Sequence, residues 1–193
     1  MDKIVFASSN IDKLNEIILF FSKLKTKIYL PKDFRIFNEP NESGKTFAEN
    51  AKIKSSFGYQ KTLIPCFADD SGICIEALNW GPGIKSKRFL DKFKNKTKCF
   101  EFIIDKTRKN KKNRAFFQTS ICLTLKENYH IIFEGTLMGT ISSQVLGKHG
   151  FGYDPIFIPN KEVKTLAQMN KYKKNEISHR SMAITKLVNF LSY

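Results

Sequence analysis

The chain has 193 residues, a formal net charge of +15 and 41% hydrophobic residues, including 18 Phe. This length and apolar content predict one globular domain over residues 1–193 and exclude an intrinsically disordered chain. No apolar stretch approaches the roughly 20 residues that a membrane helix needs, and "MDKIVFASSN" lacks signal-peptide anatomy. We therefore expect a cytoplasmic protein with no membrane partner.

The first part of the chain predicts strands alternating with helices. Residues 3–8 form a short apolar strand, and residues 11–24 repeat apolar side chains at helical spacing after Asn10 or Asp12 as a possible cap. Residues 27–30 predict a second strand. Residues 46–60 predict a helix, with Thr46 and Glu49 in capping-box spacing. Further strands are expected at 64–68 and 73–78, on either side of "DDSG" at 69–72.

The second part predicts a longer strand pair between helices. After a turn at 79–83, residues 91–109 suggest a basic helix, and residues 114–127 alternate apolar and polar side chains. Residues 129–141 continue this pattern after a turn at Glu127 and Asn128, which predicts an antiparallel hairpin. A short strand at 155–159 and an amphipathic helix at 178–193, capped by Ser178, complete the chain. The pattern is typical of an α/β fold with a mixed sheet.

The positive charge has two interpretations, a solvated surface or a patch that binds a polyanion. Only five of the 33 basic residues are Arg, and the 28 Lys are spread along the chain, with their densest runs at 92–98 and 106–112. A nucleic-acid binder should cluster basic residues and interleave aromatics or arginines. We therefore expect no nucleic-acid partner, and a basic nucleic-acid-binding protein is kept as the alternative class.

The four cysteines are expected to be buried free thiols. Cys66, Cys74, Cys99 and Cys122 lie among apolar residues and have no CxxC spacing. Zinc sites and disulfide frameworks usually show such spacing or a secretory context. The sequence shows neither pattern.

The first polar stretch that could carry chemistry is residues 8–13. It joins the first strand to the first helix, where backbone N–H groups and the positive end of the helix dipole suit a phosphate. Ser8, Ser9 and Asn10 add donors, and Lys13 adds a positive charge. The alternative is an ordinary capped helix, since the Walker pattern GxxxxGK[ST] is absent.

The second stretch is acidic. Asp69 and Asp70 follow a predicted buried strand, where a loop could present them to a cleft, and Glu42 and Glu49 are further candidates. Hard oxygen ligands without a His or Cys cluster favour Mg²⁺. A carboxylate not fully used by the metal could accept a proton from an attacking water. The alternative is a solvated turn.

The third stretch is "GFGYDP" at 150–155. Gly150 and Gly152 would let the backbone approach a ligand closely, while Phe151 and Tyr153 could stack on a flat ring and Asp154 could accept a hydrogen bond. The alternative is an aromatic turn that fills part of the core.

The fourth stretch is "KKNEISHRS" at 173–181. His179 and Arg180 begin the last helix, at an end that normally favours anions, so these residues suggest recognition donors. A hydrogen bond from either residue to a carbonyl oxygen would distinguish a 6-keto purine from adenine.

Six stretches together resemble the inosine/xanthosine triphosphate pyrophosphatase family over the whole chain: "ASSNIDK", "TFAENA", "ADDSGICIEAL", "PGIKSKRF", "GFGYDPIF" and "NEISHRS". The resemblance implies an elongated mixed central sheet with flanking helices, two lobes around an active-site cleft, and a homodimer. It also implies Mg²⁺-dependent hydrolysis of ITP, dITP and XTP to the monophosphate and pyrophosphate. A related nucleotide pyrophosphatase of other base specificity is the alternative enzyme.

The resemblance also assigns roles to residues. Asp70 is implied as proton acceptor and Mg²⁺ ligand, Glu42 as second metal carboxylate, and Asp69 as support for both. For the triphosphate, the resemblance implies contacts from residues 8–13 (Ser8, Ser9, Asn10 and Lys13) and from Ser71. For the base and sugar, it implies Phe151, Gly152, Tyr153 and Asp154. For the base pocket, it implies Lys174, His179 and Arg180.

Overall fold

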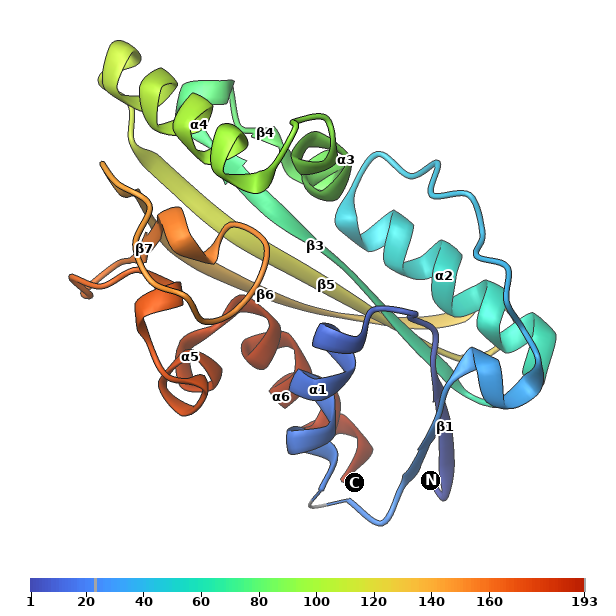
Figure 1. The fold of residues 1–193 in the computed structure, drawn as a ribbon. Helices are drawn as coiled ribbons and strands as arrows, with labels where there is room; N and C mark the ends of the chain where they lie inside the picture. Colours follow the sequence, from blue (N-terminus) through green and yellow to red (C-terminus); the bar gives the residue numbers. More distant parts are fainter. Residues whose placement is uncertain (23, 193) are drawn as a thin grey trace. The chain divides into compact units, whose positions relative to one another are not determined.

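The computed structural model describes residues 1–22 and 24–192 (Figure 1). The chain divides into two compact units. Unit 1 comprises Met1–Asp70, Thr119–Gly135 and Arg180–Tyr193, and unit 2 comprises Ser71–Gln118 and Thr136–His179. Three strands contribute residues to both units: β3 (Cys66–Ile75), β5 (Arg114–Lys126) and β6 (Tyr129–Ile141). The single domain expected from the sequence stays a prediction.

The sheet of unit 1 begins with parallel strands. β1 (Lys3–Phe6) pairs in parallel with β2 (Lys27–Tyr29) on one side and with β3 on the other. The strand order continues through β5 to β6. A two-residue turn at Glu127 and Asn128 joins β5 to β6, as the sequence predicted, and Asn128 adopts a left-handed φ of 59°.

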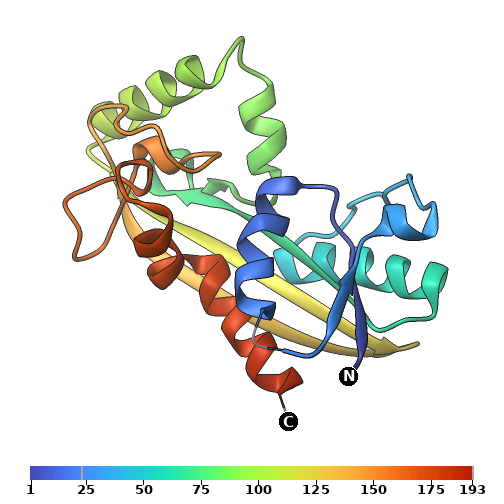
Figure 2. The ribbon, with the colours of Figure 1, turned by 60° about the horizontal axis from the view of Figure 1, so that its bottom comes forward.

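Helices cover both faces of the unit 1 sheet. α1 (Ile11–Phe21) and α6 (His179–Leu191) lie side by side in both views (Figures 1 and 2). Apolar residues of both helices form one cluster with Phe6 and Phe67. On the other face, Tyr59 of α2 (Phe47–Thr62) packs against a cluster that contains Val5 and Cys66. Because successive side chains of a strand point to opposite faces, Phe6 and Phe67 join the first cluster, whereas Val5 and Cys66 join the second.

Unit 2 surrounds its own core. Its strands follow the order β4 (Gly81–Pro82), β3, β5, β6 and β7 (Phe157–Pro159), and β4 and β7 are antiparallel to their neighbours. Its helices are α3 (Ser86–Asp91), α4 (Lys96–Asn110) and α5 (Lys171–Ile177). Phe117, Phe157 and Phe100 lie in one buried cluster with apolar residues of α3 and α4.

The mixed α/β fold is confirmed, two local predictions are wrong, and two helices were missed. "DDSG" is not a turn between two strands, because residues 69–72 lie inside the single strand β3. The basic helix expected at 91–109 begins later, at Lys96, because Asn95 caps α4 by accepting a hydrogen bond from the Lys98 backbone N–H. α3 and α5 were not predicted. In the described ranges, no helix is long and apolar enough to cross a membrane.

Candidate active site

β3 presents two neighbouring carboxylates to opposite faces of the unit 1 sheet. Successive side chains of a strand alternate, so Asp69 shares the face of Phe67, toward α1 and α6, while Asp70 shares the face of Cys66, toward α2. Both are buried, with exposed fractions of 1% and 7%. A charge buried this deeply needs partners, and each Asp finds them on its own side.

Asp69 lies in a network of buried charges. Lys13 Nζ is 2.9 Å from its Oδ2, and Arg180 Nε donates to the same oxygen at 3.4 Å. The Arg180 guanidinium also donates to Glu16 of α1. Arg180 is only 3% exposed. In the part of the chain that the structure describes, Oδ1 of Asp69 is buried without a hydrogen-bond partner, so this oxygen can accept a further donor or cation.

The charges around Asp69 keep it ionised. Burial is the largest single influence and favours the neutral acid, but the attractions of Lys13, Arg180 and Lys54 together outweigh it. The pKa of Asp69 therefore lies well below its ordinary value. Burial, which favours the neutral amine, lowers the pKa of Lys13 despite the attraction of Asp69.

Asp70 faces a different environment. Asn50 Nδ2 donates to its Oδ2 at 3.1 Å, and Lys54 Nζ lies 3.5 Å from its Oδ1. Lys54 also donates to Glu42 Oε1 at 2.9 Å. Burial raises the pKa of Asp70, because Lys54 and Asn50 only partly offset the loss of hydration. Two adjacent carboxyls thus have pKa values shifted in opposite directions, a pattern found where acid and base roles are divided.

Asn50 ties the loop before α2 to Asp70. Its Oδ1 accepts from the Gly44 backbone N–H at 2.9 Å, while its Nδ2 holds Asp70. A Cβ on Gly44 would lie 2.6 Å from Asn50 Oδ1, so glycine permits this approach. Thr46 caps α2 by accepting from the Glu49 N–H at 3.1 Å, and the Glu49 carboxylate accepts from the backbone of Lys45. In the described structure, Glu49 thus helps to cap the N-terminus of α2.

The 8–13 stretch forms the expected helix start. Asn10 Oδ1 accepts from the backbone N–H groups of Asp12 and Lys13 at 2.9 and 3.2 Å, and Ser8 Oγ accepts from the Asn10 N–H. Ser9 Oγ donates to Glu39 Oε1. Asn10 is thus the cap of α1, and the polar side chains of the stretch surround the positive end of the helix.

In unit 2, residues of the "GFGYDP" stretch contact Lys174. Lys174 Nζ donates to Asp154 Oδ2 at 2.7 Å and lies 4.6 Å from the centre of the Phe151 ring. The Phe151 backbone N–H donates to the same carboxylate at 2.8 Å. Gly150 and Gly152 have φ values of 75° and 61°, which favour glycine in the turn.

Tyr153 and His179 are part of the unit 2 core. Tyr153 OH donates to the Ser86 backbone carbonyl at 2.7 Å, and its ring packs against Phe100. The His179 ring stacks on Phe117 with their centres 4.7 Å apart. Ser71 follows Asp70 in β3 and is half-buried.

Glu42 and Asp70 form a donor set that fits a divalent cation. Both carboxylates contact one ammonium group, that of Lys54, so a positive charge between them is already favourable. Across residues 1–22 and 24–192, no group of three or more His, Cys, Asp or Glu could hold a metal. Mg²⁺ commonly takes only one or two protein carboxylates and completes its shell with waters and phosphates.

Sequence reasoning found most of this set but missed three residues. Glu16, Asn50 and Lys54 hold the carboxylates and arginine in unit 1. A signal was present in the spacing, because Asn50 and Lys54 are four apart and Lys13 and Glu16 three apart, which places each pair on one face of a helix.

Two buried carboxylates with oppositely shifted pKa values, held by lysines, an arginine and an amide, are typical of an enzyme active site. The chain belongs to the Ham1 family, whose model matches residues 4–190. It is 40% identical to the dITP/XTP pyrophosphatase of Borrelia duttonii, over 99% of this chain and 98% of that protein. It is 36% identical to that of Leptospira interrogans, over 98% and 96%.

Solved structures agree with this family. A HAM1 protein from Coxiella burnetii matches with a TM-score of 0.92 and 35% identity, covering 100% of this chain and 99% of that one. The Staphylococcus aureus Ham1 protein matches with a TM-score of 0.89 at 35% identity, covering 99% and 98%. The resemblance stated from the motifs is confirmed.

Proposed function

We propose that this chain hydrolyses the non-standard purine nucleotides ITP, dITP and XTP to the monophosphate and pyrophosphate and so cleanses the nucleotide pool. The observation that carries the proposal is Asp70, a buried carboxyl with a raised pKa that two polar side chains fix in place. The names of relatives that match nearly the whole chain support the substrate class.

The triphosphate would bind at the start of α1. Ser8, Ser9 and Asn10 bring polar groups to the positive end of this helix, and Lys13 supplies charge one turn inside it. Asp69 holds Lys13 in place and stays ionised at neutral pH. We assign Ser71, the residue after Asp70, to the same phosphates.

Asp70 would accept the proton of the attacking water. A raised pKa makes a carboxylate a stronger base, and Asn50 and Lys54 restrict its orientation. Glu42 and Asp70 would hold a Mg²⁺ ion, which neutralises phosphate charge and orients the reacting oxygens when it is bound.

The base would be read by residues of unit 2. Asp154 and Lys174 form a buried ion pair beside Phe151, and we assign Gly152, Tyr153 and His179 to the same recognition group. Donation from Arg180 to a 6-keto oxygen stays a prediction, alongside its observed pairing with Asp69 and Glu16. A cytoplasmic homodimer likewise stays a prediction.

The test is product analysis of the purified protein with ITP, XTP, GTP and ATP, with Mg²⁺ or with a chelator. We expect monophosphate and pyrophosphate from ITP and XTP only when Mg²⁺ is present, and little product from ATP. Asp70→Asn should lower kcat by about 10²–10⁴-fold, the range of a lost general base, while the circular dichroism spectrum stays unchanged. Equal turnover of all four nucleotides would reject base recognition, and full activity of the variant would reject the role of Asp70.

A further inference from the structure

Unit 2 concentrates the positive charge of the protein. Residues 85–114 contain 13 Lys and Arg but only three acidic residues, a net charge of +10 out of +15 for the whole chain. All 13 basic residues are exposed. Glu101 and Asp105 each pair with a basic residue one turn away on α4, so a large positive excess remains on α3, α4 and the turns beside them.

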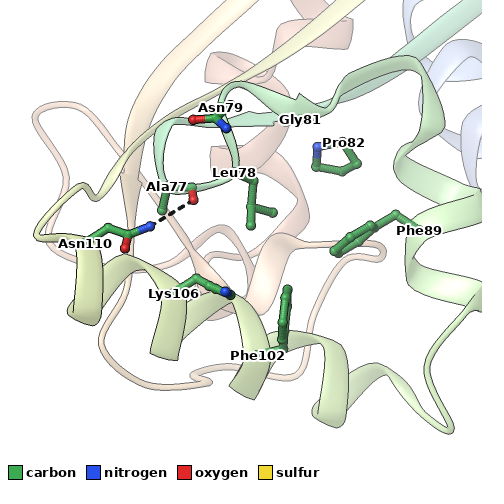
Figure 3. A pocket seen from close by; sticks show the side chains of 9 residues that line it. All are labelled: Ala77, Leu78, Asn79, Gly81, Pro82, Phe89, Phe102, Lys106 and Asn110. Atoms are coloured by element: carbon green, nitrogen blue, oxygen red, sulfur yellow. Dashed lines mark hydrogen bonds between the residues drawn. The ribbon is translucent and has the colours of Figure 1, made fainter.

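An open groove lies on this same part of unit 2. Its volume is about 510 Å³. Phe89 of α3 and Phe102 of α4 line it together with Leu78 and Pro82, and Lys106 and Asn110 stand along its α4 side (Figure 3). Asn110 donates to the Ala77 backbone carbonyl at 3.2 Å, which fixes the end of α4 against the groove wall.

The groove offers aromatic surface beside cations. Phe102 is 37% exposed, and its ring forms an aromatic cluster with Phe89 and Phe93. Lys106 Nζ lies 5.6 Å from the centre of the Phe102 ring. Trp80, next to the groove residue Asn79, is 42% exposed and lies against Phe116. Aromatic faces that bases can stack on, next to a row of cations, are the two elements of single-strand recognition.

We propose that this groove and the basic surface of α3 and α4 bind single-stranded nucleic acid. A second copy of the chain is disfavoured because two surfaces of charge +10 would repel one another. Duplex is disfavoured because its bases are stacked and cannot enter an apolar groove. Basic residues lie at both ends of α4, a 15-residue helix of about 22 Å, and this separation suits a chain of phosphates better than one nucleotide. The proposal takes up the alternative class named from the sequence, a basic protein that binds nucleic acid.

The test measures binding of a fluorescent 12-nucleotide oligo(dT) by anisotropy at several salt concentrations. The charge variant replaces Lys94, Lys109 and Lys112 by Ala, and its matched control replaces the exposed residues Lys3, Lys25 and Lys164, with the same change of net charge. We expect the first variant alone to bind more weakly and to lower the slope of log K against log salt by about 2, as expected for three lost phosphate contacts. Equal weakening in both variants would overturn the proposal.

A second variant tests the groove itself. Phe102→Ala should weaken oligo(dT) binding by about 5- to 150-fold, the effect of losing one stacking platform, while turnover of ITP stays unchanged. The lost ring contacts with Phe89 and Phe93 should lower the melting temperature without preventing folding. Unaltered oligo(dT) affinity in this folded variant, equal affinity for a 12-bp duplex, or displacement of the oligonucleotide by saturating dITP would each overturn the proposal. So would a loss of self-association in sedimentation of the Phe102 variant, since it would assign the groove to a second copy.

Discussion

At the scale of single residues, the central feature is the opposite treatment of two adjacent carboxyls. Asp69 is surrounded by positive charge and its pKa falls, whereas Asp70 is held by one amide and one ammonium and its pKa rises. The division follows from strand geometry, because neighbouring residues of β3 point to opposite faces. One strand therefore supplies two chemically different groups.

Arg180→Ala should destabilise the fold strongly. The change leaves Glu16 and Asp69 buried without the cation that pairs with both, and breaking such a buried pair costs about 3–5 kcal/mol. Urea denaturation measures the free energy of unfolding. The control is Arg108→Ala, whose pair with Asp105 is exposed and should matter little. Equal losses in the two variants would show that the Arg180 network does not stabilise the protein.

Asn50→Ala should lower kcat by about 10-fold or more and change KM less. The variant frees Asp70 to rotate and leaves the Gly44 N–H without its acceptor, a cost of about 1–3 kcal/mol in a buried setting. Steady-state kinetics with ITP measures both constants. Ser55→Ala changes the same helix at a side chain that bonds to Thr124 and not to Asp70, so it should retain kcat. A normal kcat for Asn50→Ala would remove this residue from positioning.

At the scale of elements, α1 combines a helix cap with the proposed phosphate site. Asn10→Ala removes the acceptor for two backbone N–H groups and should lower the free energy of unfolding by about 0.5–2 kcal/mol. It should also raise KM for ITP. Asn95→Ala removes the equivalent cap of α4 and should affect stability alone. If both variants raise KM equally, the effect belongs to stability and not to phosphate binding.

The sequence predicts elements better where local chemistry and tertiary contacts agree. α1 was predictable because Asn10 caps it and apolar residues recur along it. β3 was predicted in two pieces, because Asp-Asp-Ser-Gly favours a turn locally and only Lys13, Arg180 and Lys54 make the buried strand tolerable. Those partners lie 16 to 111 residues away along the chain, so local reasoning does not reach them.

The sequence also predicted part of the candidate site and missed another part. The motifs gave Asp69, Asp70 and the start of α1, which the structure brings together in unit 1. They did not give Asn50, whose role appears only once Gly44 and Asp70 lie on either side of its amide. The dense lysine runs at 92–98 and 106–112 were visible in the sequence, but the groove lined by Phe89 and Phe102 beside them was not.

At the scale of the whole molecule, the four cysteines should be unreactive while the protein is folded. All are free and buried, as predicted. Burial raises the pKa of Cys74 and Cys99 to about 11 and raises the pKa values of Cys66 and Cys122. At pH 8 these thiols lie on the protonated side of their titration, and the thiolate is the reactive form.

A thiol reagent such as DTNB tests this at pH 8. We expect slow reaction of the folded protein and rapid reaction of all four thiols in urea. Raising the pH toward 10 should speed the reaction of Cys74 and Cys99, since a larger fraction is then ionised. Rapid labelling of the folded protein at pH 8 would contradict the burial of these residues.

The way the chain passes between its units bears on how such a protein can change during evolution. The unit boundaries fall inside β3, β5 and β6 and at the start of α6, not in linkers. A gene fragment that encodes either unit would carry broken strands, so neither unit can be lost, duplicated or transferred to another protein as a module. New specificity is therefore expected to arise by changes within an intact chain and not by exchange of one unit.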